Sequence, residues 1–108
     1  MEVPASTRDG ADDGASPMDV INNRQRGRFE IRVGDQVALL RYHESPGRIE
    51  LIHTEVPEHL AGQGIAGKLA AFALGYAREH GLRVVPTCSY VGAYIERHPE
   101  YADLLAQG

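Results

Sequence analysis

The fold of this chain is decided by the stretch HTEVPEHLAGQGIAGKLAAFALGYAREHG, residues 53–81. It begins with an alternating pattern that Pro57 interrupts, passes through a glycine-rich segment and continues with helical spacing. Large apolar residues recur there every three or four positions: Ile65, Leu69, Phe72 and Tyr76. A second row of small residues lets the helix axis lie close to a sheet: Ala66, Ala70, Ala73 and Ala77. These rows predict a helix that starts near Ile65, ends before Gly81 and buries the large row in the core.

Three strands are predicted on the N-terminal side of this helix. The first, residues 29–33, alternates apolar residues with Glu30 and Arg32, which is typical of a strand with one buried face. Turn signals containing glycine separate it from two further strands, Val37 to His43 and Ile49 to Val56. Short turns between successive strands predict an antiparallel meander.

On the C-terminal side, residues 82–85 predict a fourth strand. A strand–helix–strand unit is right-handed as a rule, so this strand is expected to lie parallel to the third strand or near it. Residues 89–97 read as a short helix that His98-Pro99 ends, and residues 100–105 as one last helical turn. The predicted class is α+β, with about four strands and helices packed against them.

Length, charge and composition limit the possible functions. The chain of 108 residues holds one domain, which we place at residues 23–108. Residues 1–22 carry five acids against Arg8 alone and are predicted to be a disordered acidic tail. The remainder is neutral, which argues against nucleic-acid binding. The single cysteine, Cys88, excludes an internal disulfide, and no apolar run suits a signal peptide or a membrane span. We therefore expect a cytoplasmic location. A monomer is the favoured oligomeric state, which the sequence leaves open.

The glycine loop between strand and helix is a natural anion site. The first N–H groups of a helix have no partner within it, and the helix dipole favours negative charge there. Gly62, Gly64 and Gly67 spell a dinucleotide-binding fingerprint, but the acidic residue expected about 20 positions later is missing. A Walker phosphate loop would need Ser or Thr where Leu69 stands. Both readings are therefore weaker than a third one.

That third reading is a resemblance to the GNAT acetyltransferase superfamily. Its loop pattern, Q/R-x-x-G-x-G/A, is matched at Gly64 and Ala66, whereas Ala61 stands at the first position. Between residues 27 and 105 the chain also resembles the short GNAT-related proteins of plants, bacteria and animals. The segments that carry this resemblance are HTEVP (53–57), G-x-G-x-A-x-x-L (62–69), VPTCSYV (85–91), Tyr94 and HPEY (98–101).

The resemblance implies that the chain binds acetyl-CoA or coenzyme A. The pantetheine arm would pair with the third strand at Thr54 and Val56, and Lys68 is a candidate partner of a phosphate. The thioester would lie where the third and fourth strands diverge, near Cys88. The backbone N–H groups that would hold the pyrophosphate come from one loop: Ala61, Gly62, Gln63, Gly64, Ile65 and Ala66. We expect no metal site.

The catalytic roles stay open at this point. Cys88 is either a nucleophile activated by the helix that follows it or a small buried apolar residue. His53 is either a general base or a structural histidine. Glu50 and Glu55 are further base candidates, and two tyrosines are candidates for the acceptor side: Tyr90 and Tyr94.

The leading functional hypothesis is transfer of an acetyl group from acetyl-CoA to an amine. The first alternative is a CoA-binding module with little or no catalysis, because the short N-terminal half lacks the part with which larger relatives hold their acceptors. A protein-interaction domain with a vestigial site is the second alternative.

Overall fold

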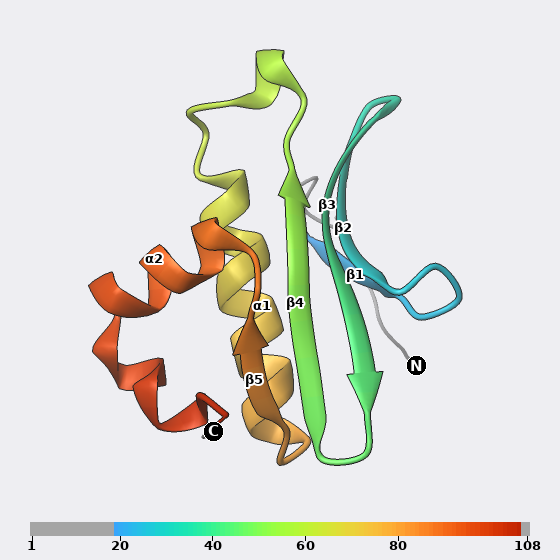
Figure 1. Ribbon diagram of the computed structural model, residues 1–108. Coiled ribbons are helices and arrows are strands. Elements are labelled where there is room, and N and C mark those ends of the chain that lie inside the picture. Colours follow the sequence, from blue (N-terminus) through green and yellow to red (C-terminus); the bar gives the residue numbers. More distant parts are fainter. Residues whose placement is uncertain (1–18, 107–108) are drawn as a thin grey trace, which may run out of the picture.

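The structure is a computed structural model that describes residues 19–106 of the chain. Its elements follow in the predicted order, with the helices on one side of a five-stranded sheet (Figure 1). In chain order they are β1 (Val20–Asn23), β2 (Arg28–Val33), β3 (Gln36–Ser45), β4 (Arg48–Glu55), the 3₁₀ helix η1 (Glu58–Leu60), α1 (Ile65–Glu79), β5 (Arg83–Pro86), α2 (Ser89–Arg97) and the 3₁₀ helix η2 (Pro99–Leu104). No helix within residues 19–106 is long and apolar enough to cross a membrane.

The sheet has the spatial order β1-β2-β3-β4-β5. The first four strands form the predicted antiparallel meander, and β5 pairs parallel to β4 through the crossover helix α1. On its outer side, β5 forms a parallel bridge from Val84 to Leu105. The α+β class with a strand–helix–strand unit is thereby confirmed.

Strand β1 was not predicted, and it adds a fifth strand. It lies almost wholly inside segment 1–22, so the expectation of disorder is wrong for residues 20–22. The pairing of Val20 with Ile31 and of Asn22 with Phe29 places this segment in the sheet. The rest of the predicted tail, residues 1–18, lies outside the described residues.

The core lies between α1 and one face of the sheet. Helix α1 contacts all five strands, and its buried face takes in residues of both predicted rows: Ile65, Leu69, Ala70, Ala73, Tyr76 and Ala77. Ala70, Ala73 and Ala77 are fully buried, whereas Phe72 is 40% exposed. The expectation that Phe72 belongs to the core is therefore wrong, although its ring still meets the edge of Phe29. The small side chains bring the helix axis so close to the sheet that Phe72 is left at the border of the contact.

Glu30 also departs from the predicted alternation, because it is fully buried. Its carboxylate accepts hydrogen bonds from Arg28, from Arg32 at 2.9 Å and from Asn23 at 3.1 Å. Burial raises the pKa of Glu30, but these hydrogen bonds outweigh it and hold that pKa below its ordinary value. The carboxylate is thus a structural ion-pair centre that fastens β1 to β2.

Candidate functional site

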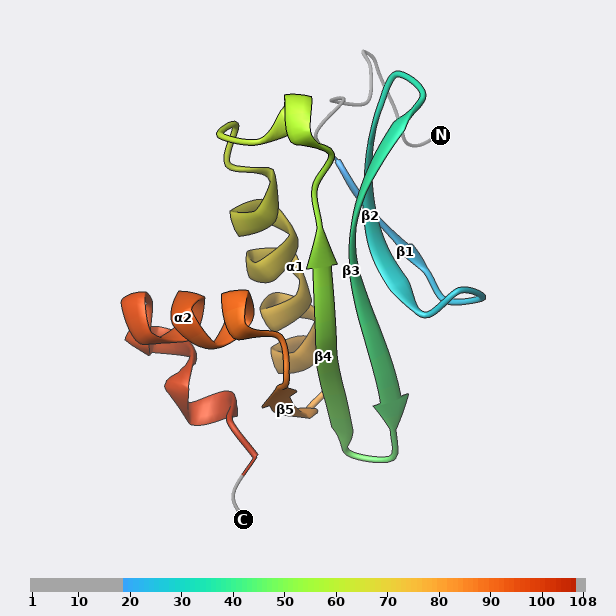
Figure 2. The same cartoon turned by 45° about the horizontal axis from the view of Figure 1, so that its top comes forward.

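Strands β4 and β5 part halfway along β4. Their pairing ends at Leu51 and Pro86, after which the chain turns away into α2. The N–H of Cys88 donates to the Leu51 carbonyl at 2.8 Å and closes the narrow end of the gap. Beyond this point the β5-facing edge of β4, from Ile52 to Glu55, has no paired strand among the described residues. Figure 2 shows β4 continuing past the end of β5 toward η1.

A β-bulge lies in β4 at the same level. Arg41 pairs with His53 and Tyr42 with Leu51, so Ile52 has no partner on β3. Directly paired residues point to the same face of a sheet. Thr54, opposite the buried Leu40, therefore points to the α1 face, as Leu51 does, although the two are three residues apart. The bulge turns the Thr54 side chain toward the gap, which is a common use of bulges beside functional sites.

Cys88 lies at the closed end of the gap, next to Thr54. It is the N-cap residue of α2 and only 7% exposed, and its Sγ lies 3.3 Å from Thr54 Oγ1. Burial raises the pKa of this thiol, but hydrogen bonds from the Thr54 side chain and from the backbone of Val91 and Tyr90 lower it by more than burial raises it. The net result is a Cys88 pKa below the ordinary value, which favours the thiolate.

The glycine loop is open to solvent. Leu60, which ends η1, is buried and anchors it, whereas residues 61–64 are all exposed. Gly62 and Gly64 have left-handed φ angles of 85° and 75°, and a Cβ at either position would meet no atom within 4 Å. The segment therefore meets one requirement of a ligand loop, since no side chain seals its backbone.

The loop leads directly into the start of α1. Gly64 is the N-cap and provides no side-chain cap, and the first helical hydrogen bond runs from the Lys68 N–H to the Gly64 carbonyl. The N–H groups of Ile65, Ala66 and Gly67 thus have no backbone acceptor within residues 19–106. Lys68 is exposed in the same turn.

One member of the predicted amide set is already engaged. The N–H of Ala61 donates to the Glu58 carbonyl at 3.1 Å, inside the η1 turn. Within residues 19–106, the backbone N–H groups that remain available to an anion therefore begin at Gly62. They end at Gly67, one residue beyond the predicted set.

The two tyrosines of α2 pack between α2 and the start of α1. A Cβ at Gly67 would lie 3.5 Å from Tyr90 Oη and 3.8 Å from a ring carbon of Tyr94, so this glycine permits the close approach of the two helices. Tyr94 also stacks on His98, with ring centroids 4.2 Å apart. Burial, followed by the neighbouring Tyr101, raises the pKa of Tyr94. Both tyrosines thus face the first turn of α1.

His53 is not brought together with Cys88. It pairs with the exposed Arg41, so its side chain points to the face opposite Thr54. His53 Nε2 lies 3.3 Å from Glu55 Oε2, and both side chains are more than half exposed. They line an open hollow of about 450 Å³ along the end of β4, together with Val37, Thr54, Val56 and Pro57.

Glu50 has a partner that was not predicted. Its Oε2 accepts a hydrogen bond from Thr87 Oγ1 at 2.5 Å, which ties β4 to the residue before Cys88. The two residues are 37 positions apart, and only the parallel pairing of β4 with β5 brings them together. No spacing in the sequence could have revealed this contact. No cluster of His, Cys, Asp and Glu suited to a metal ion occurs in residues 19–106.

A parted sheet with an open loop at the start of its crossover helix defines a GNAT-type fold. Comparison with solved structures agrees, because a GCN5-like protein from Staphylococcus aureus, determined by NMR, superposes with a TM-score of 0.66 at 25% identity. That match covers 87% of this chain and 93% of the bacterial chain.

Sequence comparison identifies the family. The family model "GCN5-related N-acetyl-transferase" matches residues 28–104. Protein NATD1 from Bos taurus is 34% identical over 101 residues, covering 91% of this chain and 89% of its own length. Protein NATD1 from Mus musculus is 36% identical over 86 residues, covering 77% and 78%. The chain belongs to the GCN5-related N-acetyltransferase family, and the resemblance to its short members is confirmed.

Proposed function

We propose that this protein binds acetyl-CoA between the glycine loop and the free edge of β4 and transfers the acetyl group to an amine. One combination of features carries the proposal: the open amides at the start of α1, the unpaired edge of β4 that leads into the glycine loop, and the low-pKa thiol at the closed end of that edge. These three features suit the diphosphate, the amide-containing arm and the thioester of acetyl-CoA, in that order.

The diphosphate would be held by backbone rather than by side-chain charge. The amides of residues 62–67 lie at the positive end of the α1 dipole, which carries roughly half an elementary charge. Lys68, one turn into the helix, adds a cation beside them. Because the chain has a net charge of −4, an anion has to be attracted by this local arrangement and not by the general field of the protein.

The pantetheine arm would lie along the open edge of β4. An unpaired strand edge offers alternating N–H and C=O groups, and the two amides of pantetheine can pair with them as a short strand would. Thr54 and Val56 are the residues we assign to this contact. The left-handed glycines at 62 and 64 add no side chain to the loop, and a Cβ at either position would meet no atom within 4 Å.

In the direct route, the amine nitrogen attacks the thioester carbonyl and the carbon–sulfur bond breaks, releasing CoA as the thiolate. A backbone N–H near the end of β4 stabilises the oxyanion. His53 is our candidate for the proton acceptor, because its ring is exposed beside the hollow and oriented by Glu55.

In the covalent route, the Cys88 thiolate first takes the acetyl group and then passes it to the amine. The lowered pKa of Cys88 favours this route, and its 7% exposure opposes it. This burial also favours the second candidate function, a CoA-binding module without catalysis. The position of His53 on the other face of the sheet favours that candidate as well.

Calorimetric titration with acetyl-CoA and CoA tests the binding step, and release of free CoA thiol over a panel of amines tests the transfer. We expect binding of both nucleotides and amine-dependent release. Binding without release would support the non-catalytic module, and no binding at millimolar concentration would refute the proposed site. Cys88→Ala separates the two routes, because full activity in this variant would eliminate the covalent one.

A further inference from the structure

We propose that a second ligand site lies at the opposite end of the sheet and binds a free α-amino acid with an apolar side chain. The site is a hollow of about 480 Å³ beside the β3–β4 turn, on the face of the sheet that carries α1. The turn lies at the far end of β4 from η1 and the glycine loop (Figure 1). The assignment is independent of acetyl transfer.

Two oppositely charged residues that line this hollow, Arg24 and Glu44, contact the same buried hydroxyl. Tyr76 Oη donates to Glu44 Oε1 at 2.7 Å and accepts from Arg24 Nη1 at 3.3 Å. These two hydrogen bonds therefore hold the Arg24 guanidinium and the Glu44 carboxylate near the same hydroxyl oxygen. Arg24 and Glu44 are nevertheless not joined to each other in any of the ion pairs found within residues 19–106. A ligand that carries an ammonium and a carboxylate on the same carbon atom can bridge them.

Each of the two groups has hydrogen-bonding capacity left. Glu44 Oε2 accepts no hydrogen bond from a side chain within residues 19–106, so it can receive an ammonium group. Toward the side chains of residues 19–106, Arg24 uses one of its five N–H groups, on Tyr76, and the others can hold a carboxylate. The α-ammonium and α-carboxylate of one amino acid meet both requirements at once.

The surrounding hydroxyls fix this arrangement before a ligand arrives. Tyr42 and Tyr76 are at most 9% exposed, and Tyr42 Oη donates to Asn22 at 2.7 Å. Burial raises the pKa of both phenols, and for Tyr76 the hydrogen bond to Glu44 raises it further. Both therefore stay protonated donors. Preorganisation of this kind lowers the entropic cost of binding.

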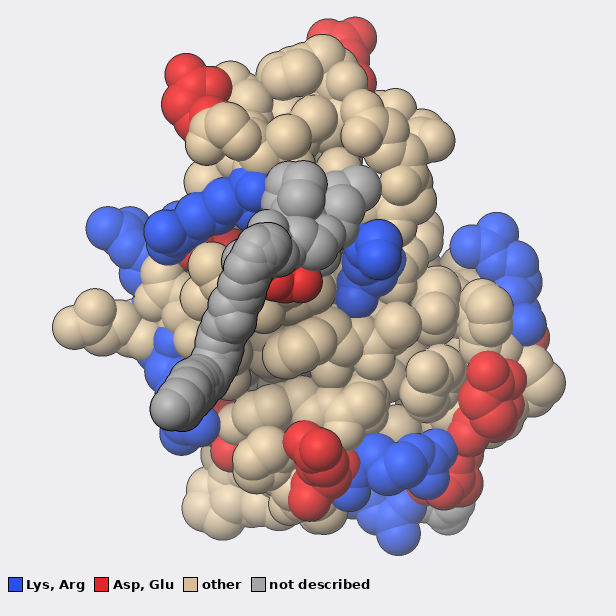
Figure 3. Space-filling view, turned by 180° about the vertical axis from the view of Figure 1, so that it is seen from behind, with Lys and Arg blue, Asp and Glu red and all other residues tan. Residues whose placement is uncertain are grey.

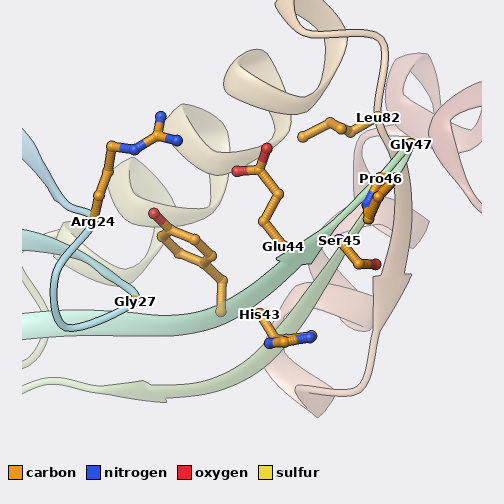
Figure 4. Close-up of a pocket in the computed structure, with 9 residues that line it drawn as sticks. Arg24, Gly27, His43, Glu44, Ser45, Pro46, Gly47 and Leu82 are labelled. Atoms are coloured by element: carbon orange, nitrogen blue, oxygen red, sulfur yellow. The ribbon is translucent and has the colours of Figure 1, made fainter.

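The walls of the hollow set the preference for an apolar side chain. Figure 4 shows the side chains of Arg24, Glu44 and Leu82 directed toward one another across the hollow, which His43 also lines. Leu82 is buried, so it presents an aliphatic wall opposite the charged pair. The rim is the turn at residues 45–47, which the Arg83 N–H holds by a 2.9 Å hydrogen bond to the Gly47 carbonyl.

Calorimetric titration of the wild-type protein with leucine and its derivatives tests the site. N-acetylleucine lacks the ammonium, leucinamide lacks the carboxylate, and leucylglycine separates the two charges. We expect leucine to bind and each derivative to bind at least tenfold more weakly, about 1.4 kcal/mol. Equal binding of leucine and leucinamide or leucylglycine would overturn the proposal, and so would no binding of leucine at millimolar concentration.

Three variants locate the site. Glu44→Gln and Arg24→Gln should each weaken leucine binding at least tenfold, and Arg24→Lys should restore part of it. Arg41→Gln is the matched control, because Arg41 is an exposed residue of the same strand and does not line the hollow. Unchanged leucine affinity in Glu44→Gln would overturn the assignment. Acetyl-CoA titration of the same variants keeps the two sites apart, since the proposed acetyl-CoA affinity should not change.

Discussion

Replacement of Gly64 by valine tests the glycine loop most directly. Gly64 has φ 75°, a left-handed conformation that costs an L-residue about 1–2 kcal/mol and more when it is β-branched. A Cβ at this position would meet no protein atom within 4 Å, so packing adds no further cost. For a domain of this size we expect Tm to fall by roughly 4–16 °C. The branched side chain would project into the open space that we assign to the diphosphate.

Gly34→Val is the matched control for that strain. Gly34 has φ 61°, is exposed, and would likewise place a Cβ in open space, but it lies in the β2–β3 turn. We expect both variants to lose similar stability, measured by thermal unfolding. Only Gly64→Val should lose affinity for acetyl-CoA in calorimetric titration, by more than tenfold.

Gly64→Asn separates obstruction from strain, because asparagine tolerates the left-handed region better than valine does. This variant should keep more stability than Gly64→Val and still bind acetyl-CoA weakly. Acetyl-CoA affinity equal to that of the wild type in Gly64→Val would refute the placement of the diphosphate. Equal loss of affinity in Gly34→Val would show that the effect comes from destabilisation alone.

Three further predictions concern single groups. The thiolate absorbance of Cys88, the only cysteine, should appear at a lower pH than that of an ordinary cysteine. Thr54→Val should move this titration to higher pH, because the variant removes the hydrogen bond to the sulfur. A titration in Thr54→Val equal to that of the wild type would contradict the assigned hydrogen bond. The pKa of Glu30 is depressed in the folded state, so its contribution to stability is present above the unfolded pKa and is lost as the pH falls through the folded pKa. In Glu30→Gln, the free energy of unfolding should therefore depend less on pH in this acidic range. An unaltered slope would contradict the structural role of the Glu30 carboxylate. Leu69→Ala should lower the free energy of unfolding in urea by about 2–5 kcal/mol, because Leu69 is fully buried under the sheet, and a loss below about 1 kcal/mol would mean that the core collapses around the deletion.

Much of the fold could be predicted from periodicity because its long elements carry their own pattern. Helix α1 begins at Ile65 and ends at Glu79, where the sequence places it, and Gly81 takes the left-handed φ of 65° just beyond it. Strand β1 could not be predicted in this way. Its four residues, VINN, have no alternation, and their strand conformation comes from pairing with β2.

The position of the core on α1 shows the limit of reading apolar rows by size. The large residues of the sequence predict that the buried arc is centred on them, and it is instead displaced toward Ala73. Small side chains bring the backbone of the helix close to the sheet, so the buried face extends over the small row and leaves Phe72 at the edge. The burial of Glu30 also departs from the alternation of the sequence, but its neighbours give a reason for it. Arg28 and Arg32 stand two residues away on the same strand face, and this spacing was a signal of its ion pairs.

The site itself divides into a part that local sequence determines and a part that only tertiary structure creates. The left-handed glycines and the free amides of the α1 start follow from the string between Ala61 and Lys68. The gap does not, because it depends on a bulge at Ile52 and on the end of β5 at Pro86. These two features decide that Thr54 points toward Cys88 while His53 points away from it. Candidate residues for binding can therefore be found by motif in this family, whereas the pairing of catalytic groups has to be read from the register of the strands.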